Sequence, residues 1–333
     1  MEEFITLSHG AGGRQTADLI GNIFKKYFAN EDFTADDAAV LTLGCDHIAV
    51  STDGFVVSPW KFPGGNIGKL SICGTVNDMA CMGAEPRYLT SAFVIEEGFP
   101  VADLEDIAAA MAKTAAEANV KIVAGDTKVV GKGQVDQIFI TTTGVGVMMP
   151  GVRTSGALAQ VGDAVIVTGD VGRHGCTILL ARNEFGIEAA VDSDCAPLGK
   201  TVKAVLDEVK DVHVIRDATR GGVGTVLYEI CEQSNVGINL FAGKIPVAEP
   251  VRGVCGMLGL EPLYLACEGR LVIFAPRCKA EKIVNILKLQ PYSANAAIIG
   301  EVTDNCGKVT VEHDFGGKTI LPQPTGELLP RIC

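Results

Sequence analysis

The segment NIGKLSICGTVNDMACM (66–82) decides the fold of the first half of this chain. Lys69 and Asp78 are its only charged residues, and nearly all the others are apolar or small. A helix that is apolar on almost every side is found inside a larger protein. We therefore predict a buried helix here, because the helical spacing of three and four residues is kept by the apolar residues at 67, 70, 73, 76, 79 and 80.

Strands and helices alternate on both sides of this segment. HIAVSTDG (47–54) predicts a strand that runs into an Asp-Gly turn, and KIVAGDT (121–127) predicts a strand that enters a loop. Between them, the Ala-rich segment 103–118 predicts a second helix with Asp103 as its N-cap. QIFITTTGVGVM (137–148) predicts a long strand. This alternation is typical of an α/β domain.

The second half restarts the pattern after Pro150-Gly151. A chain of 333 residues is long enough for two domains of roughly 150 residues each. We predict domains over 1–150 and 151–319 and a tail over 320–333. In the second domain we predict helices at 175–185, 198–209 and 280–289, a helix that ends near Ser234, and strands that begin at 162 and 213 or span 237–241, 263–266, 270–275, 297–302 and 308–312.

The last residues have a different character. After Ile320 the sequence LPQPTGELLPRIC holds three prolines and no periodic pattern, which indicates an extended, flexible arm. Fourteen residues span at most ~46 Å at ~3.3 Å each, enough to reach any site on the same subunit. The arm carries Cys333, and an exposed thiol is easily oxidised. We therefore expect Cys333 to carry chemistry.

The charge balance limits the possible partners. Twenty-eight basic and forty acidic residues give a net charge of −12, which disfavours binding to nucleic acid or to an anionic membrane. No apolar run is long enough for a transmembrane helix, and the start MEEFITLSHG lacks the features of a signal peptide. We expect a cytoplasmic protein. Its eleven cysteines show no C-x-x-C pair and no Cys/His cluster, so a zinc site is not expected.

Small acidic motifs stand where predicted strands end. Carboxylates in such places suit Mg²⁺, and glycine-rich turns offer free N–H groups to phosphates. Asp beside Gly is also ordinary turn chemistry, so a structural role stays open. GGNIGKLS (64–71) is not a P-loop, because Pro63 and Leu70 occupy positions where that motif needs Gly and Ser or Thr. The acidic residues are Asp36, Asp37, Asp53, Asp78, Asp126 and Asp217.

Taken together, these motifs resemble the HypE family of hydrogenase maturation proteins. That family lies in the aminoimidazole ribonucleotide synthetase (PurM-like) superfamily of ATP-dependent enzymes. The resemblance extends over the whole chain. It rests on SHGAGGR (8–14), DDAAV (36–40), STDG (51–54), NDMACMGAEP (77–86), GDTKV (125–129), RDATRGG (216–222), ACEGRL (266–271) and PRIC (330–333).

The resemblance implies a fold, cofactors and partners. It implies two PurM-like α/β domains, of which the N-terminal one is a half-barrel that forms a homodimer, and a flexible tail. ATP and Mg²⁺ would bind in a cleft between the domains. The carbamoyltransferase HypF would load a carbamoyl group onto Cys333. The chain would then use ATP to remove water from that group, and the HypC–HypD complex would accept the cyanide for a [NiFe] hydrogenase.

The chemistry of such a reaction is consistent with those cofactors. Converting an amide into a nitrile expels oxygen, and phosphorylation turns that oxygen into a good leaving group. A base must also take protons from the nitrogen. By resemblance, Lys128 and Glu268 act with Cys333 in catalysis. A phosphate-binding role for Lys128 and a salt bridge for Glu268 stay open.

The resemblance also assigns the binding residues. The chain departs from the family pattern at Arg173, directly before His174, where the family more often has Asp. The implied metal ligands are Asp36, Asp37, Asp53, Asp78, Asp126 and Asp217. The implied nucleotide contacts are Asp53, Asn77, Asp78, Gly125, Asp126, Thr127, Asp217, Thr219, Arg220 and His174.

Other functions remain open at this point. A selenophosphate synthetase would carry Cys or selenocysteine near the N-terminal glycine-rich loop, and residues 8–16 contain none. A small-molecule kinase or synthetase of the same superfamily would leave Cys333 unexplained. A prenylation box needs Cys at the fourth position from the end. A non-catalytic scaffold with a docking tail would show neither ATP hydrolysis nor a covalent change at Cys333.

Overall fold

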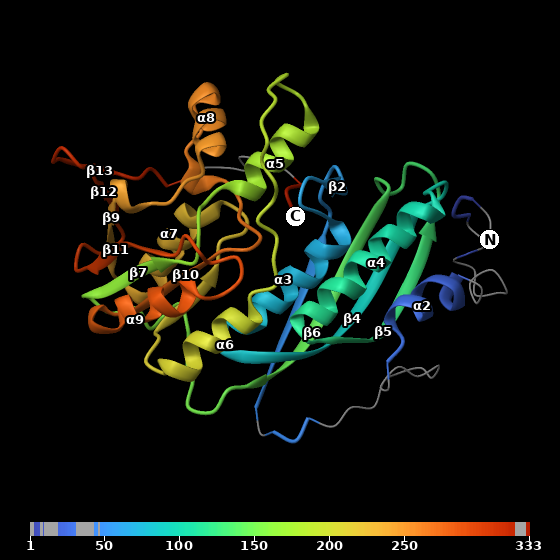
Figure 1. Cartoon of the computed structure of the whole chain (residues 1–333), viewed down its shortest axis with the longest axis horizontal. Helices are drawn as coiled ribbons and strands as arrows, with labels where there is room; N and C mark the ends of the chain where they lie inside the picture. The colour runs from blue at the N-terminus through green and yellow to red at the C-terminus, as the bar shows by residue number, and fades with distance from the viewer. Residues whose placement is uncertain (1–2, 7–8, 10–18, 31–42, 46, 324–330) are drawn as a thin grey trace.

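The computed structural model of the chain describes residues 3–6, 9, 19–30, 43–45, 47–323 and 331–333. Two sheets, each with its own helices, lie side by side (Figure 1). The predicted α/β class is confirmed. The segment between the two sheets, after Met148 and before Asp163, includes the predicted boundary at Pro150.

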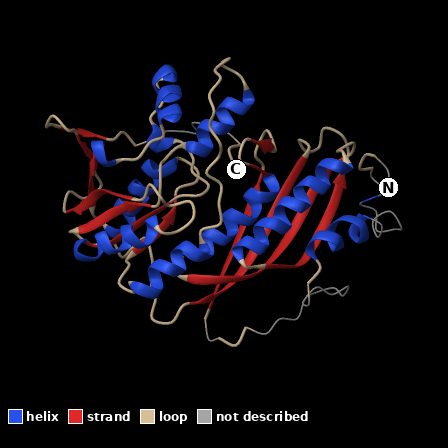
Figure 2. Cartoon of the chain, viewed as in Figure 1, coloured by secondary structure: helices blue, strands red, loops and turns tan. Residues whose placement is uncertain are grey.

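The first sheet has four strands, and two long helices lie across one face of it (Figure 2). Its strand order is β1-β6-β4-β5, with β4 and β5 parallel and the other neighbours antiparallel. In the described residues this sheet is open and does not close into a barrel. The elements are β1 (Ile48–Phe55), α3 (Ile67–Cys81), β4 (Ala84–Glu96), α4 (Val101–Ala118), β5 (Lys121–Val130) and β6 (Ile138–Met148).

Helix α3 is the buried helix that the sequence predicts. Every residue of it except Lys69 and Asp78 is buried. The helix begins after Asn66, whose side-chain oxygen accepts a hydrogen bond from the Lys69 N–H. It packs between the sheet, α4 and the second domain, so its whole circumference is covered.

None of the described helices covers the other face of the first sheet. Side chains alternate between the two faces of a strand. Phe55 and Ile140 point toward α3 and are buried, whereas Ile48 and Val50 point away, with exposed fractions of 48% and 61%. Apolar side chains in such a position indicate a surface that another molecule covers.

The second domain is built on a seven-stranded sheet with helices on both faces. Its strand order is β13-β12-β9-β11-β7-β10-β8. Helix α7 packs on one face, and α6 and α9 pack on the other. The elements are β7 (Asp163–Val167), α5 (Arg173–Arg182), α6 (Gly199–Glu208), β8 (Val214–Asp217), α7 (Gly222–Ser234), β9 (Gly237–Phe241), α8 (Glu249–Leu258), β10 (Leu271–Pro276), α9 (Arg277–Lys288), β11 (Ala297–Thr303), β12 (Val309–Glu312) and β13 (Lys318–Ile320).

Short elements complete the described chain. A π-helical turn, η2 (Ile20–Phe24), leads into α2 (Lys25–Phe28) beside α4 and β5. A two-stranded hairpin of β2 (Lys61–Phe62) and β3 (Gly65–Asn66) precedes α3. A 3₁₀ turn spans Ala242–Lys244. No described helix has the length and apolar character needed to cross a membrane.

Several predicted elements differ from the structure. The central strand β4 and the helix α8 were not predicted, since Pro86 disfavours a strand and Gly253 disfavours a helix. β4 accommodates Pro86 at a bulge, where its pairing with β6 shifts register. The predicted strand at 263–266 is wrong, because Pro262–Tyr264 forms a 3₁₀ turn. Helix α4 begins after Pro100, so Asp103 lies in its first turn and is not the N-cap.

Gly68→Ala tests how tightly α3 is packed. A Cβ at this position would lie 2.5 Å from the Ile107 carbonyl oxygen on α4, and a backbone atom cannot move aside cheaply. We expect overpacking to lower stability by about 1–3 kcal/mol and to lower the urea midpoint of unfolding. The matched control is Gly253→Ala in α8, where a Cβ meets open space. There the better helix propensity of Ala should raise stability by up to about 1 kcal/mol. Equal midpoints for the two variants would contradict this packing.

Candidate functional site

The last three residues are docked against the segment that follows β1. The Val56 N–H donates to the Cys333 carbonyl oxygen at 3.0 Å, and the Ser58 N–H donates to the Arg331 carbonyl oxygen at 3.2 Å. The Arg331 guanidinium in turn donates to the Val56 carbonyl oxygen at 3.0 Å. The described end of the predicted flexible arm is therefore held in place, and Ile320, where the arm was expected to begin, belongs to β13.

His174 secures the same tripeptide from the second domain. Its Nε2 lies 2.7 Å from the Ile332 carbonyl oxygen, and its Nδ1 lies 2.7 Å from the Ser193 hydroxyl. A carbonyl oxygen only accepts, so Nε2 carries the proton and Nδ1 accepts from Ser193. Burial lowers the pKa of His174, in agreement with a neutral ring. His174, which we predicted to contact nucleotide, contacts the tail in this structure.

Docking places the Cys333 thiol among charged groups from both domains. Burial raises the pKa of this thiol, and the Glu268 charge raises it further. Arg220 acts in the opposite direction, whereas Asp53 and Asp217 add to the increase. Cys333 is therefore a neutral thiol at physiological pH while it is docked. The structure thus brings together the predicted residues Cys333, Glu268, Asp53, Asp217 and Arg220.

Carboxylates from β1, α3 and β8 make this region acidic. The pKa of Asp78 rises to about 6, mainly because of burial and then because of the nearby Asp217 charge. The Ser51 hydroxyl donates to Asp78 at 2.7 Å and partly offsets that rise. Burial is also the main cause of the raised pKa of Asp53. Each carboxylate therefore gains from a cation placed between them.

Glu268 is the most deeply buried acid of the group. Its side chain is 2% exposed, and its Oε1 has no hydrogen-bond partner in the described part of the molecule. Burial raises its pKa well above the usual range, with Cys195 and Asp194 adding to the effect. Burial therefore favours its protonated form, and its free oxygen remains available to a bound group.

Asn77 has a structural function here. Its Oδ1 accepts from the Leu198 N–H at 2.7 Å, and its Nδ2 donates to the Ala196 carbonyl oxygen at 3.1 Å. Both ends of its amide thus hold the second domain against α3, and the side chain is 3% exposed. The Asn77 amide therefore has no free polar atom left for the nucleotide contact that we predicted.

The loop after β8 carries Thr219 and Arg220 beside the same site. It turns sharply through Gly221 and Gly222, whose φ angles of 72° and 60° favour glycine. A Cβ on Gly222 would lie 2.5 Å from two carbonyl oxygens of the 263–265 segment. Helix α7 begins at Gly222, so this close approach fixes the loop beside Asp53.

The predicted residues of β5 lie elsewhere. Asp126 shares a cross-strand row with Gly54 through β4 and β6, so it faces the uncovered side of the sheet, opposite to Asp53. Strands β1 and β5 are the two edges of the sheet, three strand spacings or about 14 Å apart. Lys128 lies on the same face and pairs with Asp126 at 2.9 Å. One subunit therefore does not bring Lys128 to Cys333.

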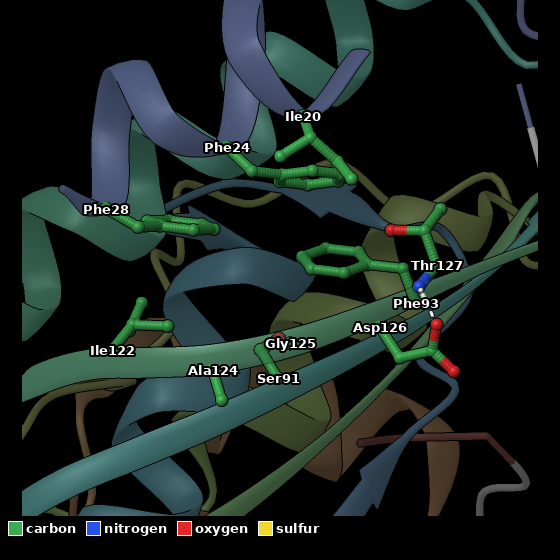
Figure 3. A pocket seen from close by; sticks show the side chains of 10 residues that line it. All are labelled: Ile20, Phe24, Phe28, Ser91, Phe93, Ile122, Ala124, Gly125, Asp126 and Thr127. Carbon is green, nitrogen blue, oxygen red and sulfur yellow. Dashed lines mark hydrogen bonds between the residues drawn. The ribbon is translucent and has the colours of Figure 1, made fainter. Parts of the chain in front are cut away.

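An apolar pocket lies next to Asp126 and Thr127 (Figure 3). Its volume is about 150 Å³. The Ser91 hydroxyl lines it and is buried without a hydrogen-bond partner among the described residues. Asp126 Oδ1 accepts from the Thr127 N–H at 2.8 Å at the edge of the pocket. The full lining is Ile20, Phe24, Phe28, Ser91, Phe93, Ile122, Ala124, Gly125, Asp126 and Thr127.

Two predicted metal ligands, Asp36 and Asp37, lie outside the described residues. Among the residues that the structure does describe, no three Asp, Glu, His or Cys side chains are gathered closely enough to hold a metal ion by themselves. The oxygen donors at Asp53, Asp78 and Asp217 nevertheless suit a hard cation. Mg²⁺ commonly takes only one or two carboxylates, and phosphate oxygens and water complete its coordination.

Sequence reasoning missed two residues of this region, Ser193 and Asp194. They lie in 183–197, which shows no regular pattern in the sequence. Both are buried: Ser193 contacts His174, and Asp194 Oδ1 accepts the Glu268 N–H at 3.1 Å. In the sequence these two residues are simply polar residues shortly before a predicted helix. Residues that cap a helix produce the same pattern, so the sequence does not indicate their role.

The raised pKa of Cys333 makes docking of the tail depend on pH. The free thiol has a pKa of about 8.5, so the docked state favours the protonated form. Docking is therefore at full strength below about pH 8.5 and is lost as the pH rises toward the docked pKa. We expect the protection of Cys333 from alkylation, relative to a free LPRIC peptide, to stay constant up to about pH 8.5 and to fall between about pH 8.5 and pH 10. Peptide mass spectrometry measures this protection.

The exposed Cys278 serves as the internal control for this experiment, since it has no docked state to lose. Protection of Cys333 that stays constant over this pH range would show that its burial is not coupled to the protonation of its thiol.

Comparisons with known proteins agree with this geometry. Residues 35–148 match the N-terminal domain model of AIR synthase related proteins, and residues 160–312 match the C-terminal domain model. The chain is 45% identical to the carbamoyl dehydratase HypE of Azotobacter vinelandii, over 99% of this chain and 97% of that protein.

Solved structures give the same result. A crystal structure of the hydrogenase maturation protein HypE in complex with ATP superposes with a TM-score of 0.95 at 43% identity, covering 98% of this chain and 99% of that one. A HypE–HypF complex superposes with a TM-score of 0.82 at 46% identity, covering 92% and 99%. The chain belongs to the HypE family of AIR synthase related proteins.

Proposed function

We propose that this chain is an ATP-dependent carbamoyl dehydratase that acts on its own Cys333. The observation that carries the proposal is the docking of Cys333 beside the buried Glu268 and the acidic ends of β1 and β8. Relatives that are similar over nearly their whole length are named carbamoyl dehydratases, and one was solved with ATP. The product would supply the cyanide ligand of a [NiFe] hydrogenase centre.

The reaction balances with one ATP. The oxygen of the thiocarbamate on Cys333 attacks the γ-phosphorus of ATP, and ADP leaves. Loss of the two nitrogen protons and cleavage of the C–O bond release phosphate and leave a thiocyanate on the sulfur. The oxygen that an amide would expel as water thus leaves on phosphate, which is a far better leaving group.

Glu268 is placed to handle protons in this reaction. While protonated, it can donate a hydrogen bond to the thiocarbamate oxygen. Its raised pKa also makes its carboxylate strongly basic once it is ionised, as a proton acceptor for the nitrogen requires. The unpartnered Oε1 is the atom that would contact the bound group.

ATP and Mg²⁺ are part of the proposal. Asp53, Asp78 and Asp217 would hold the cation, together with Asp36 and Asp37 as the family resemblance implies. Asp126, the sixth ligand that the resemblance implies, faces the other side of the sheet and would join them only from the second copy of a dimer. When bound, Mg²⁺ would neutralise the phosphate charges. The pocket of Figure 3 is our candidate for the adenine ring, because its aromatic and aliphatic walls suit a flat ring and the Ser91 hydroxyl offers a hydrogen bond.

A homodimer would complete the site. The uncovered face of the first sheet exposes Ile48 and Val50, and Asp126 and Lys128 lie on that same face. If two copies pack these faces together, β5 of one copy can approach the tail site of the other. Lys128 does not reach the tail site within one subunit. In the dimer it could serve there as the second proton acceptor or bind phosphate.

Loading of the tail requires release from its dock. A docked thiol with a raised pKa is a poor nucleophile, since the thiolate is the reactive form. We therefore propose that HypF loads the carbamoyl group onto the released tail and that the HypC–HypD complex meets the tail after dehydration. A solved HypE–HypF complex of similar chains supports the first of these partners.

Mass spectrometry of the peptide that contains Cys333 tests the function. After incubation with HypF, carbamoyl phosphate and ATP, we expect a carbamoyl adduct on Cys333 that loses the mass of one water. When ATP is removed before the final step, the adduct should remain intact. Glu268→Gln should load normally but keep the carbamoyl adduct, with dehydration slowed at least about 100-fold, as expected for loss of an acid-base group.

Cys333→Ser is the matched control and should carry no thiocyanate. If Cys333 stays unmodified with an active donor, the dehydratase proposal fails. ATP turnover on a free small molecule would then favour a synthetase or kinase of the same superfamily, and no ATP turnover would favour a scaffold.

Val50→Lys tests the dimer. A charge on the uncovered sheet face would have to be buried without a partner, so we expect the variant to elute as a monomer in size-exclusion chromatography with light scattering, whereas the wild type elutes as a dimer. Val161→Lys is the control, because Val161 is equally exposed at 61% but lies before β7, away from this face. A dimer that survives Val50→Lys would place the interface elsewhere.

A further inference from the structure

We propose that the four residues Ser193–Ala196 form a positioning segment that sets the Cys333 thiol against Glu268, with Ser193 and Asp194 as positioning residues for dehydration. The inference rests on the proposed function, because it explains how the loaded sulfur and the acid are aligned. Two adjacent residues of this segment support the tail and Glu268, respectively. Ser193 acts on the tail through His174, and Asp194 acts on Glu268 directly.

The contact with the tail is a continuous chain of hydrogen bonds. The Cys195 N–H donates to the Ser193 hydroxyl oxygen at 3.1 Å, and that hydroxyl donates to His174 Nδ1 at 2.7 Å. His174 Nε2 then donates to the Ile332 carbonyl oxygen at 2.7 Å. Ser193 thereby selects the ring tautomer that can donate to the tail. Each bond in such a chain strengthens the next.

The contact with Glu268 fixes its backbone on both sides. Asp194 Oδ1 accepts the Glu268 N–H at 3.1 Å. The Ala196 N–H donates to the Glu268 carbonyl oxygen at 3.4 Å, and Asn77 Nδ2 lies 3.5 Å from that oxygen. Asp194 is fully buried, with Arg270 3.8 Å away as its counter-charge. The side chain of Glu268 is thus aimed by a fixed backbone.

The positioning segment itself has little room to move. The Ser193 N–H donates to the Pro63 carbonyl oxygen at 2.9 Å, which ties the segment to the β2–β3 hairpin. A Cβ on Gly269 would lie 1.8 Å from the Asp194 carbonyl oxygen, so only glycine permits this approach. Arg270 is held by Asp170 at 2.9 Å. Ser193 and Asp194 are adjacent, and consecutive Cα atoms lie 3.8 Å apart. The supports of the tail and of Glu268 are therefore held at a short, fixed separation.

Three variants test the proposal in the full-length protein. Ser193→Ala removes the proton donor to His174. Asp194→Ala removes the support of Glu268, and Asp194→Asn keeps an acceptor for the Glu268 N–H, which makes it the conservative rescue. The controls are Ser234→Ala and Asp163→Asn. Ser234 also makes two backbone hydrogen bonds, and Asp163 is a buried, hydrogen-bonded Asp of the second domain, both outside this site.

The first readout is alkylation of Cys333 in the unloaded protein. Ser193→Ala should raise the alkylation rate roughly threefold to tenfold, because one hydrogen bond of the dock is lost.

The second readout is the single-turnover rate of dehydration after HypF loading. Ser193→Ala and Asp194→Ala should lower this rate at least about tenfold with the KM for ATP unchanged, since misplacement of reacting groups affects the chemical step. Asp194→Asn should recover most of the rate, and loading should not slow.

The proposal is overturned if Ser193→Ala changes neither readout, or if Asp194→Asn is as slow as Asp194→Ala. An equally large loss of dehydration rate in Ser234→Ala or Asp163→Asn would also overturn the proposal, because it would show that general destabilisation causes the loss. If the wild type itself does not dehydrate Cys333, the proposed function fails. The alkylation series on unloaded protein would then still decide whether Ser193 holds the tail.

Discussion

The burial of helix α3, which leaves only Lys69 and Asp78 partly exposed, is the constraint on which the rest of the structure depends. A helix without a polar face cannot border on water, so the sheet, α4 and the second domain must cover it from different sides. Its two polar residues near the end, Asn77 and Asp78, are then forced into the boundary between the domains. Asn77 satisfies its amide with backbone groups of the second domain. Asp78 accepts a hydrogen bond from the Ser51 hydroxyl, the one side-chain hydrogen bond that it makes within the described residues.

The placement of Cys333 follows from this boundary. The tail docks where β1 leaves the sheet, and α5 of the second domain supplies His174 and Arg182 to hold it. Ile332 packs into the core of the first domain, with 5% of its surface exposed. Burial raises the pKa of a thiol fixed in this way and so disfavours the reactive thiolate. Burial is the main cause of this rise in pKa, and the charges of Glu268, Asp53 and Asp217 add to it.

The acid-base character of the site has the same origin. Glu268 and Asp78 are acids whose pKa values rise chiefly because burial disfavours their charged forms. Burial thus favours the protonated form of Glu268, whereas Asp78, with a pKa of about 6, is mainly a carboxylate at neutral pH and gains from a nearby cation. The region therefore combines a buried proton donor with carboxylates that gain from a bound cation. The positioning segment Ser193–Ala196 adds the alignment between this chemistry and the tail.

The sequence alone determined the α/β class, the buried helix α3 and most of the strands, because these depend on local periodicity. Through its resemblance to a family it also pointed to Cys333, Glu268, Asp53 and Asp217, whose roles stay predictions. Asp126, which we expected in a loop after a strand, lies inside β5. It did not predict β4, whose Pro86 is tolerated only because a bulge between paired strands absorbs it. Only the tertiary structure showed that His174 binds the tail, that Asn77 is a structural link and that Lys128 faces away from Cys333. These roles depend on which distant segments meet and which face of a strand is turned inward. The roles of Ser193 and Asp194 were likewise hidden, because their partners His174 and Glu268 are 19 and 74 residues away in sequence.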